Sequence, residues 1–162
     1  MNQRYDAVCG LYCGACRVVQ SNERGCLEEL AREWNREPDD LVCHGCKSSV
    51  RAVFCRDCRF IVCAESRGVE YCSECSDFPC EELLAFRDDD APHHSAVVRN
   101  SEMMRELGVE RWLETQSKRW SCPECGARSW WYLDVCGSCG SALRDARAEE
   151  AETDTSFEGT PS

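Results

Sequence analysis

The sequence carries 16 cysteines in 162 residues, and their spacing is typical of metal ligands. Most of them form C-x-x-C pairs, and the rest stand singly. The pairs are Cys13/Cys16, Cys43/Cys46, Cys55/Cys58, Cys72/Cys75, Cys122/Cys125 and Cys136/Cys139, and the single cysteines are Cys9, Cys26, Cys63 and Cys80. In a C-x-x-C turn both thiolates face one point, where they bind zinc or iron. We therefore predict that all 16 are metal ligands, with Zn²⁺ in up to four sites.

The thiols are expected to be reduced, because the N-terminus does not resemble a secretory signal. It has no basic segment followed by a long apolar run and a small-residue cleavage site. No stretch approaches the roughly 18 apolar residues that a membrane span needs. We therefore predict a cytoplasmic protein, in which paired cysteines are more often metal ligands than disulfides. Without its cysteines only about a third of the chain is apolar, so metal is expected to replace much of the core.

The last two pairs form the clearest predicted site. Cys122/Cys125 and Cys136/Cys139 are separated by ten residues, and each pair is followed directly by glycine. Glycine at that position permits the positive φ that such a tight turn often needs. Two of these turns at the tips of adjacent hairpins make a zinc ribbon, whose four thiolates leave no position open for catalysis. A rubredoxin-like iron site is the alternative, because it uses similar turns.

The other twelve cysteines lie in residues 1–82 and make three four-ligand sites by arithmetic. The sequence does not determine which of them share a site, and chain-order and interleaved partitions are both open. In chain order the sets are Cys9, Cys13, Cys16 and Cys26; Cys43, Cys46, Cys55 and Cys58; and Cys63, Cys72, Cys75 and Cys80. His44 is a candidate replacement ligand. Cys26 is the doubtful member, because a buried free cysteine on a helix has the same pattern.

An iron–sulfur cluster in this N-terminal block is the alternative to zinc. The ferredoxin runs C-x2-C-x2-C-x3-C-P and C-x4-C-x2-C do not occur, so a cluster would need less regular ligands. The block also contains one repeat, because residues 54–64 and 71–81 align without gaps. Each copy has an aromatic residue, a C-x-x-C pair and a third cysteine five positions later. The repeat suggests two related half-sites.

Short helices are expected to position these cysteines. Apolar residues recur at helical spacing in residues 26–36, and a second helix is predicted to start near residue 77, with Cys80 in its first turn. Residues 93–119 contain no cysteine and predict two helices separated at Gly108. The last segment has six acidic residues, one basic residue and few apolar ones, which predicts disorder.

These features predict a small irregular α+β fold, metal-stabilised and rich in cysteine, with short helices. The predicted cysteine-rich metal-binding domain covers residues 1–88. A helical connector follows over residues 89–119, then a β zinc ribbon over residues 120–144 and a disordered acidic tail over residues 145–162.

The net charge of −11 argues against nucleic-acid or anionic-membrane binding by the whole chain. Residues 116–144 are an exception, because they combine four basic with four aromatic residues. The basic residues are Lys118, Arg119, Arg128 and Arg144, and the aromatic residues are Trp120, Trp130, Trp131 and Tyr132. Exposed aromatic side chains stack on nucleotide bases. We favour the other interpretation, in which they cover a small module and dock it on the preceding helices.

No catalytic constellation occurs: the sequence has no P-loop, no G-x-G-x-x-G and no Ser-His-Asp or Cys-His arrangement. The leading hypothesis is a zinc-binding cytosolic protein with structural four-cysteine sites. It would act as an interaction or adaptor module for another protein, without catalysis of its own. The alternatives are an iron–sulfur electron carrier, a thiol redox sensor, and nucleic-acid binding through the predicted ribbon.

Several motifs follow one another in a recognisable order. They are Cys9-Gly-Leu-Tyr-Cys13-Gly-Ala-Cys16, Cys43-His-Gly-Cys46, Phe54-Cys-Arg-Asp-Cys58, Cys72-Ser-Glu-Cys75-Ser-Asp-Phe-Pro-Cys80, Gly108-Val-Glu-Arg-Trp112-Leu and Arg119-Trp120-Ser-Cys122-Pro-Glu-Cys125-Gly. Over roughly residues 6–143 the chain resembles a prokaryotic cysteine-rich family of unknown function, to which zinc binding is attributed. The resemblance implies metal binding and no particular activity. In that family the position of Cys26 is usually not cysteine, which leaves one site with three cysteines plus a histidine or water, or a cluster.

Overall fold

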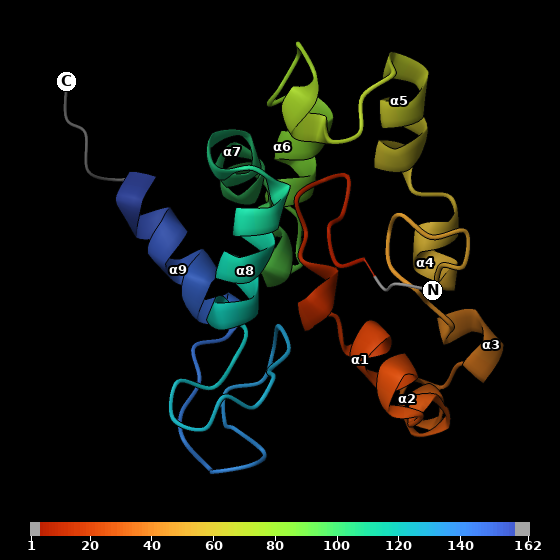
Figure 1. The fold of residues 1–162 in the computed structure, drawn as a ribbon, viewed down its shortest axis with the longest axis vertical. Helices are drawn as coiled ribbons and strands as arrows, with labels where there is room; N and C mark the ends of the chain where they lie inside the picture. Colours follow the sequence, from red (N-terminus) through yellow and green to blue (C-terminus); the bar gives the residue numbers. More distant parts are fainter. Residues whose placement is uncertain (1–3, 158–162) are drawn as a thin grey trace.

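The structure of the protein is a computed structural model that describes residues 4–157. The regular elements of these residues are helices (Figure 1). The α-helices are α1 (Arg17–Arg24), α2 (Leu27–Trp34), α3 (Pro38–Leu41), α4 (Val53–Arg56), α5 (Arg59–Arg67), α6 (Glu81–Arg87), α7 (Val97–Leu107), α8 (Val109–Arg119) and α9 (Ala146–Phe157). Short 3-10 helices are η1 (Cys13–Ala15), η2 (Cys72–Glu74) and η3 (Pro92–His94). Within these residues β pairing is limited to isolated bridges. The predicted α+β fold class is therefore wrong, because the protein is mostly helical.

The β-strands of the predicted zinc ribbon are wrong, because this part of the backbone makes long-range hydrogen bonds instead. Each C-terminal C-x-x-C turn closes a single antiparallel bridge, and no strand extends from it. Between the turns the backbone bonds to η1 and α1 instead. The N–H of Trp131 donates to the carbonyl of Ala15 at 3.3 Å, and the carbonyl of Ser129 accepts from the side chain of Gln20 at 2.7 Å. These groups are therefore used for docking, and the four cysteines lie in loops.

The helices predicted from apolar spacing are present. In α2, Leu30 and Ala31 are buried, and the helix ends at Asn35, which has a φ of 51°. Helices α7 and α8 meet at Gly108, as predicted. Helix α6 begins at Glu81, so that Cys80 precedes the helix rather than lying in its first turn. None of the described helices is both long enough and apolar enough to cross a bilayer.

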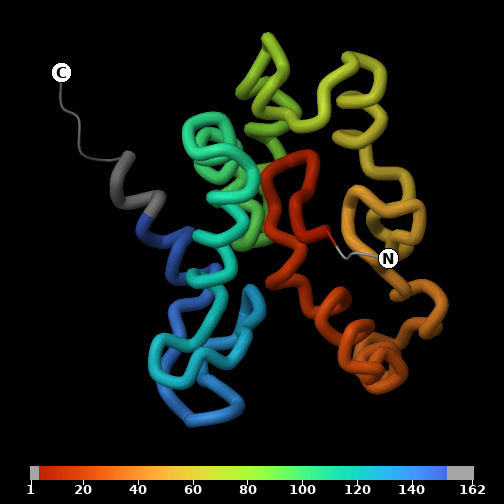
Figure 2. The backbone as a smooth tube through the Cα atoms, viewed as in Figure 1, coloured from red at the N-terminus to blue at the C-terminus, as the bar shows by residue number. Residues whose placement is uncertain are grey.

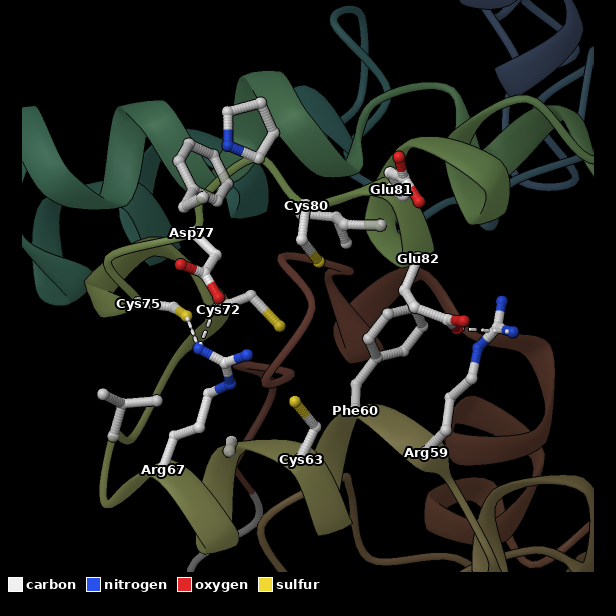
Figure 3. Close-up of a pocket in the computed structure, with 15 residues that line it drawn as sticks. Arg59, Phe60, Cys63, Arg67, Cys72, Cys75, Asp77, Cys80, Glu81 and Glu82 are labelled. Carbon is white, nitrogen blue, oxygen red and sulfur yellow. Dashed lines mark hydrogen bonds and ion pairs between the residues drawn. The ribbon is translucent and has the colours of Figure 1, made fainter.

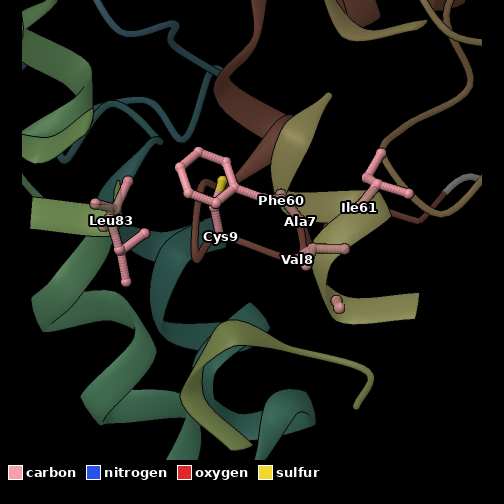
Figure 4. Close-up of a cluster of buried hydrophobic side chains, with 8 residues drawn as sticks. Ala7, Val8, Cys9, Phe60, Ile61 and Leu83 are labelled. Atoms are coloured by element: carbon pink, nitrogen blue, oxygen red, sulfur yellow. The ribbon is translucent and has the colours of Figure 1, made fainter. Parts of the chain in front are cut away.

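The N-terminal segment, residues 6–19, contacts each of the three hydrophobic clusters found among residues 4–157. In Figure 1 it runs between α6–α8 on one side and α4–α5 on the other. Its first part packs against α5, α6 and α7 in a cluster of Ala7, Val8, Cys9, Phe60, Ile61, Ala64, Leu83 and Val97 (Figure 4). Its middle joins Trp112 and Trp120 in the second cluster, and α1 joins α2 and α3 in the third. The segment therefore links three small cores.

Gly10 allows this segment to lie directly against α7. Its φ is +88°, and a Cβ added there would lie 2.6 Å from the carbonyl oxygen of Val97 and 2.5 Å from the Oγ of Ser101. The side chain of Asn100 donates to the carbonyl of Gly10 at 2.9 Å. A side chain at position 10 would push the segment away from α7.

Helix α9 occupies most of the segment for which the composition predicts disorder. Asp145 caps it, because its Oδ1 accepts from the N–H of Ala148 at 3.0 Å. Ala146 is buried in the second cluster, and Glu149 forms an ion pair with Arg119 at 2.7 Å. Tertiary contacts thus stabilise a helix that the local sequence does not predict. Figure 2 shows the C-terminal loops between α8 and α9 along the chain, and residues 158–162 of the predicted tail lie outside the described residues.

Candidate metal centres

Four thiols meet at the C-terminal C-x-x-C turns. The Sγ atoms of Cys122, Cys125, Cys136 and Cys139 all lie within 4.8 Å of one another. The sulfur atoms of Cys122 and Cys139 are 3.6 Å apart, and so are those of Cys125 and Cys136. Since Zn–S bonds are about 2.3 Å long, a tetrahedral zinc ion separates its ligand sulfurs by about 3.8 Å. This four-cysteine cluster is therefore able to bind a metal ion such as zinc.

The two turns that carry these thiols have the same construction. The N–H of Cys122 donates to the carbonyl of Ala127 at 2.7 Å, and the N–H of Cys136 donates to that of Ser141 at 2.8 Å. The glycine after each pair has a positive φ, of 73° and 77°. The first cysteine of each pair is buried and the second is exposed. The cluster therefore lies at the surface, with one side closed by the protein.

Hydrogen bonds within the second turn favour thiolates. The backbone N–H groups of Cys139 and Ser138 lower the pKa of Cys136. The hydroxyl of Ser141, 3.1 Å from the sulfur of Cys139, is the main cause that lowers the pKa of Cys139 to about 6. The thiolate is the form of cysteine that binds metals. The arrangement can hold a divalent cation with four protein ligands, a coordination typical of structural sites.

Polar contacts fix the C-terminal loops to η1 and α1. Gln20 is 2% exposed and donates from Nε2 to the carbonyls of Gly14 at 2.9 Å and Ser129 at 2.7 Å. Arg128 donates to the same Gly14 carbonyl from Nε and Nη2, and it forms an ion pair with Glu23 at 2.7 Å. The loops that carry the four cysteines are thus connected to η1 and α1 through these hydrogen bonds.

The aromatic and basic residues of this segment make contacts inside the protein. Trp120 is 5% exposed, and Trp131 stacks on His93 with ring centroids 4.0 Å apart. Nδ1 of His93 lies 2.5 Å from the hydroxyl oxygen of Tyr132. Three of the four basic residues, Arg119, Arg128 and Arg144, form ion pairs with carboxylates. These contacts agree with the favoured docking interpretation, and nucleic-acid binding by this segment stays a prediction.

Seven cysteines of the N-terminal block lie near one another but come from three separate segments. They are Cys9, Cys13, Cys16, Cys43, Cys46, Cys55 and Cys58. Burial raises the pKa of Cys9 well above its ordinary value, and the nearby thiols of Cys46 and Cys58 raise it further. Burial likewise raises the pKa of Cys16 to about 11, and Cys43 adds to this effect. The neighbours are interleaved along the chain, which is one of the two partitions left open by the sequence.

The remaining N-terminal cysteines are four that line one cavity and a single residue, and one of the four, Cys72, also lies near Cys9 and Cys58. Cys63, Cys72, Cys75 and Cys80, the third set of the chain-order partition, line one cavity (Figure 3). Cys26 directly precedes α2, and its thiol lies 3.6 Å from the carbonyl oxygen of Ser21. The structure places Cys26 outside the three cysteine groups. His44 is half-buried in the turn between Cys43 and Cys46.

Two polar residues at these sites are not predicted from the sequence. Gln20 docks the C-terminal loops, and the only signal for it is one polar residue beside Val18 and Val19 in a buried stretch. Arg67 donates from Nη1 to the sulfur of Cys75 at 3.4 Å. Nothing in the sequence spacing distinguishes Arg67 from the other arginines, because its partner Cys75 lies eight residues later, beyond the end of α5.

Fold and sites together define a small helical, cysteine-rich protein with a four-cysteine cluster that is able to bind a metal ion. The model of a family described as "Protein of unknown function (DUF3795)" matches residues 5–85, half of the chain, and the chain belongs to this family. Comparisons with curated proteins and with solved structures gave no match. The matched region contains the seven-cysteine group, the cavity cysteines and Cys26. The C-terminal cluster lies outside it.

Proposed function

We propose that Cys122, Cys125, Cys136 and Cys139 bind Zn²⁺ as a structural ion. The observation that carries this proposal is the convergence of their four sulfur atoms within 4.8 Å. Four thiolates fill the tetrahedral shell of zinc and leave no position for a substrate. Structural zinc contributes roughly 10–16 kcal/mol in zinc-finger peptides, which is as much as the whole stability of about 5–15 kcal/mol of most proteins.

In this proposal the zinc ion keeps the C-terminal loops in the conformation that docks. It fixes the two turns relative to each other and so shapes the ten residues between them. Those residues include Arg128 and Ser129, which bond to Gly14 and Gln20 of the N-terminal domain. Loss of zinc is therefore expected to release the C-terminal loops from Gly14 and Gln20.

The experiment is native mass spectrometry with elemental analysis of the full chain and of the double variant Cys136→Ser/Cys139→Ser. We expect the variant to hold one zinc ion fewer than the wild type and to unfold at lower temperature. The matched control is Cys26→Ser, which removes a thiol outside the three cysteine groups and should keep the zinc content. Equal zinc content in the wild type and the double variant would contradict the proposal. If the metal ion that the wild type holds and the double variant lacks is iron rather than zinc, the rubredoxin-like alternative is supported.

For the protein as a whole, the role we favour is that of an adaptor that binds another protein in the cytosol without catalysis. Two features support it: the closed coordination of the C-terminal cluster, and the apolar side chains of Phe54 on α4 and Val62 on α5, which are 57% and 62% exposed. We expect the wild type to retain a protein from its own host that a Phe54→Ser/Val62→Ser variant does not retain. Equal retention of this protein by the wild type and the variant would refute a role of Phe54 and Val62 in the interaction.

A further inference from the structure

A second cysteine-lined site lies between α5 and the N-terminus of α6. Its cavity has a volume of about 860 Å³, and four cysteines line it: Cys63, Cys72, Cys75 and Cys80. Cys63 comes from α5, Cys72 from η2, Cys75 from the residue after η2, and Cys80 from the residue before α6. Figure 3 shows the sulfur atoms of Cys63, Cys72 and Cys80 directed into the same space from different walls. Four cysteines therefore line one cavity, and three of their sulfur atoms point into it.

These four sulfur atoms are spread more widely than those of the C-terminal cluster. Among residues 4–157, only one group of three or more His, Cys, Asp or Glu ligand atoms lies within 4.8 Å of one another, and it is that of the four C-terminal cysteines. The cavity cysteines thus surround a space without converging on a point. A single tetrahedral ion needs ligand sulfurs about 3.8 Å apart, whereas an iron–sulfur cluster places several iron and sulfide atoms between its cysteine ligands.

The walls of the cavity suit a cluster of this kind. Phe60, Phe78 and Leu83 supply apolar surface to the lining, while Cys63 is exposed to solvent. Solvent exposure is one of the factors that set the reduction potential of a cluster. Arg67 brings a positive charge to the rim. It donates to the sulfur of Cys75 at 3.4 Å and forms an ion pair with Asp77 at 2.6 Å. Hydrogen bonds to ligand sulfurs stabilise the negative charge of a cluster and tune its reduction potential.

We propose that Cys63, Cys72, Cys75 and Cys80 ligate an iron–sulfur cluster in this cavity, with Arg67 as a positioning residue that donates to a ligand sulfur. The protein then has two kinds of metal centre: zinc where sulfur atoms converge, and a cluster where they surround a larger space. The two sites share no ligand, so each can be tested without the other.

The test uses the full chain, produced with a supply of iron and sulfide and purified without oxygen. Iron, acid-labile sulfide, zinc and visible absorbance are measured in the wild type and in Cys63→Ser/Cys80→Ser. We expect the variant to lose iron and sulfide in equal amounts, about two to four of each per chain, together with visible absorbance. Its zinc content should not change. Wild-type iron and sulfide in the variant would overturn the proposal. So would a wild type that holds no iron or sulfide and a variant that loses zinc instead, or a loss of iron without sulfide.

Two controls separate loss of the cluster from failure to fold. Cys26→Ser should keep the full iron and sulfide content, and Cys136→Ser/Cys139→Ser should lose zinc but keep the iron and sulfide. For Cys63→Ser/Cys80→Ser, retained zinc at the C-terminal cluster reports a folded protein. Arg67→Gln supplies an independent readout, since it should keep the cluster and shift the reduction potential to a more negative value. An unchanged potential would overturn the role of Arg67, and loss of iron and sulfide in the Cys26→Ser control would overturn the ligand assignment.

Discussion

Replacement of Gly10 by alanine tests whether the N-terminal segment must lie directly against α7. At this position a Cβ atom meets backbone, because the carbonyl oxygen of Val97 would be 2.6 Å away. Gly25 offers a matched comparison. It also has a positive φ, of 68°, but a Cβ there would have no neighbouring atom within 4 Å. The two substitutions share the conformational cost and differ in the steric one.

The expected magnitudes follow from these contacts. Alanine in the left-handed region costs about 1–2 kcal/mol, and this is the full cost expected for Gly25→Ala. In Gly10→Ala the segment must also move away from α7. That movement stretches the 2.9 Å hydrogen bond from Asn100 to the carbonyl of Gly10. A buried carbonyl without its donor costs about 1–3 kcal/mol, so we expect a total of about 2–5 kcal/mol.

Urea unfolding followed by tryptophan fluorescence, in the presence of zinc, measures both variants. We expect the unfolding midpoint of Gly10→Ala to fall clearly further than that of Gly25→Ala, with similar slopes for both. Equal midpoints would refute the argument, because they would show that the close approach of Gly10 to Val97 adds nothing to the conformational cost.

Three further predictions concern other parts of the protein and use the same unfolding assay. Gln20→Met should lose about 1–3 kcal/mol, because the carbonyl of Ser129 loses its donor while that of Gly14 keeps Arg128; an unchanged midpoint would count against docking through Gln20. Leu41→Ala should cost about 2–5 kcal/mol, since Leu41 is 1% exposed, and a cost below about 1 kcal/mol would contradict its role in the third cluster. Burial lowers the pKa of His93 to about 3, so the unfolded chain, with a pKa of about 6.5, binds the proton first and stability falls as the pH drops below that value. Between pH 7 and about 5.5 the wild type should therefore lose about 1 kcal/mol more than His93→Phe, and equal losses would disprove this linkage.

The C-terminal cluster could be predicted because its information is local. Each C-x-x-C pair with its glycine determines a turn by itself, and ten residues bring the two turns together. The ribbon strands were predicted wrongly because the intervening backbone binds Gln20 and Ala15, which lie more than a hundred residues away. Local spacing thus predicts which four thiols converge, and distant contacts determine the fold around them.

In the N-terminal block the groups of cysteines depend on tertiary structure. Cys9 lies near Cys46 and Cys58 because residues 7–9 pack on α5 in the first hydrophobic cluster. No spacing rule relates positions so far apart. The repeat shows the same limit: in the second copy all three cysteines line the cavity, but in the first copy only Cys63 does. Sequence similarity between the copies therefore did not determine equivalent sites.

Metal binding and folding are expected to be coupled in this protein, because its cysteine groups lie where the small cores meet. The first cluster contains Cys9, and the third contains Cys43, so the seven-cysteine group spans both. The largest of the three clusters has eight buried residues, and cores of this size rarely stabilise a chain alone. Many of the thiols between them are buried, with raised pKa values, and a bound cation lowers the pKa of a thiol that coordinates it. Metal at these positions would therefore ionise the thiols and join the cores in one step, which is the same coupling that makes small zinc domains fold only with their ion.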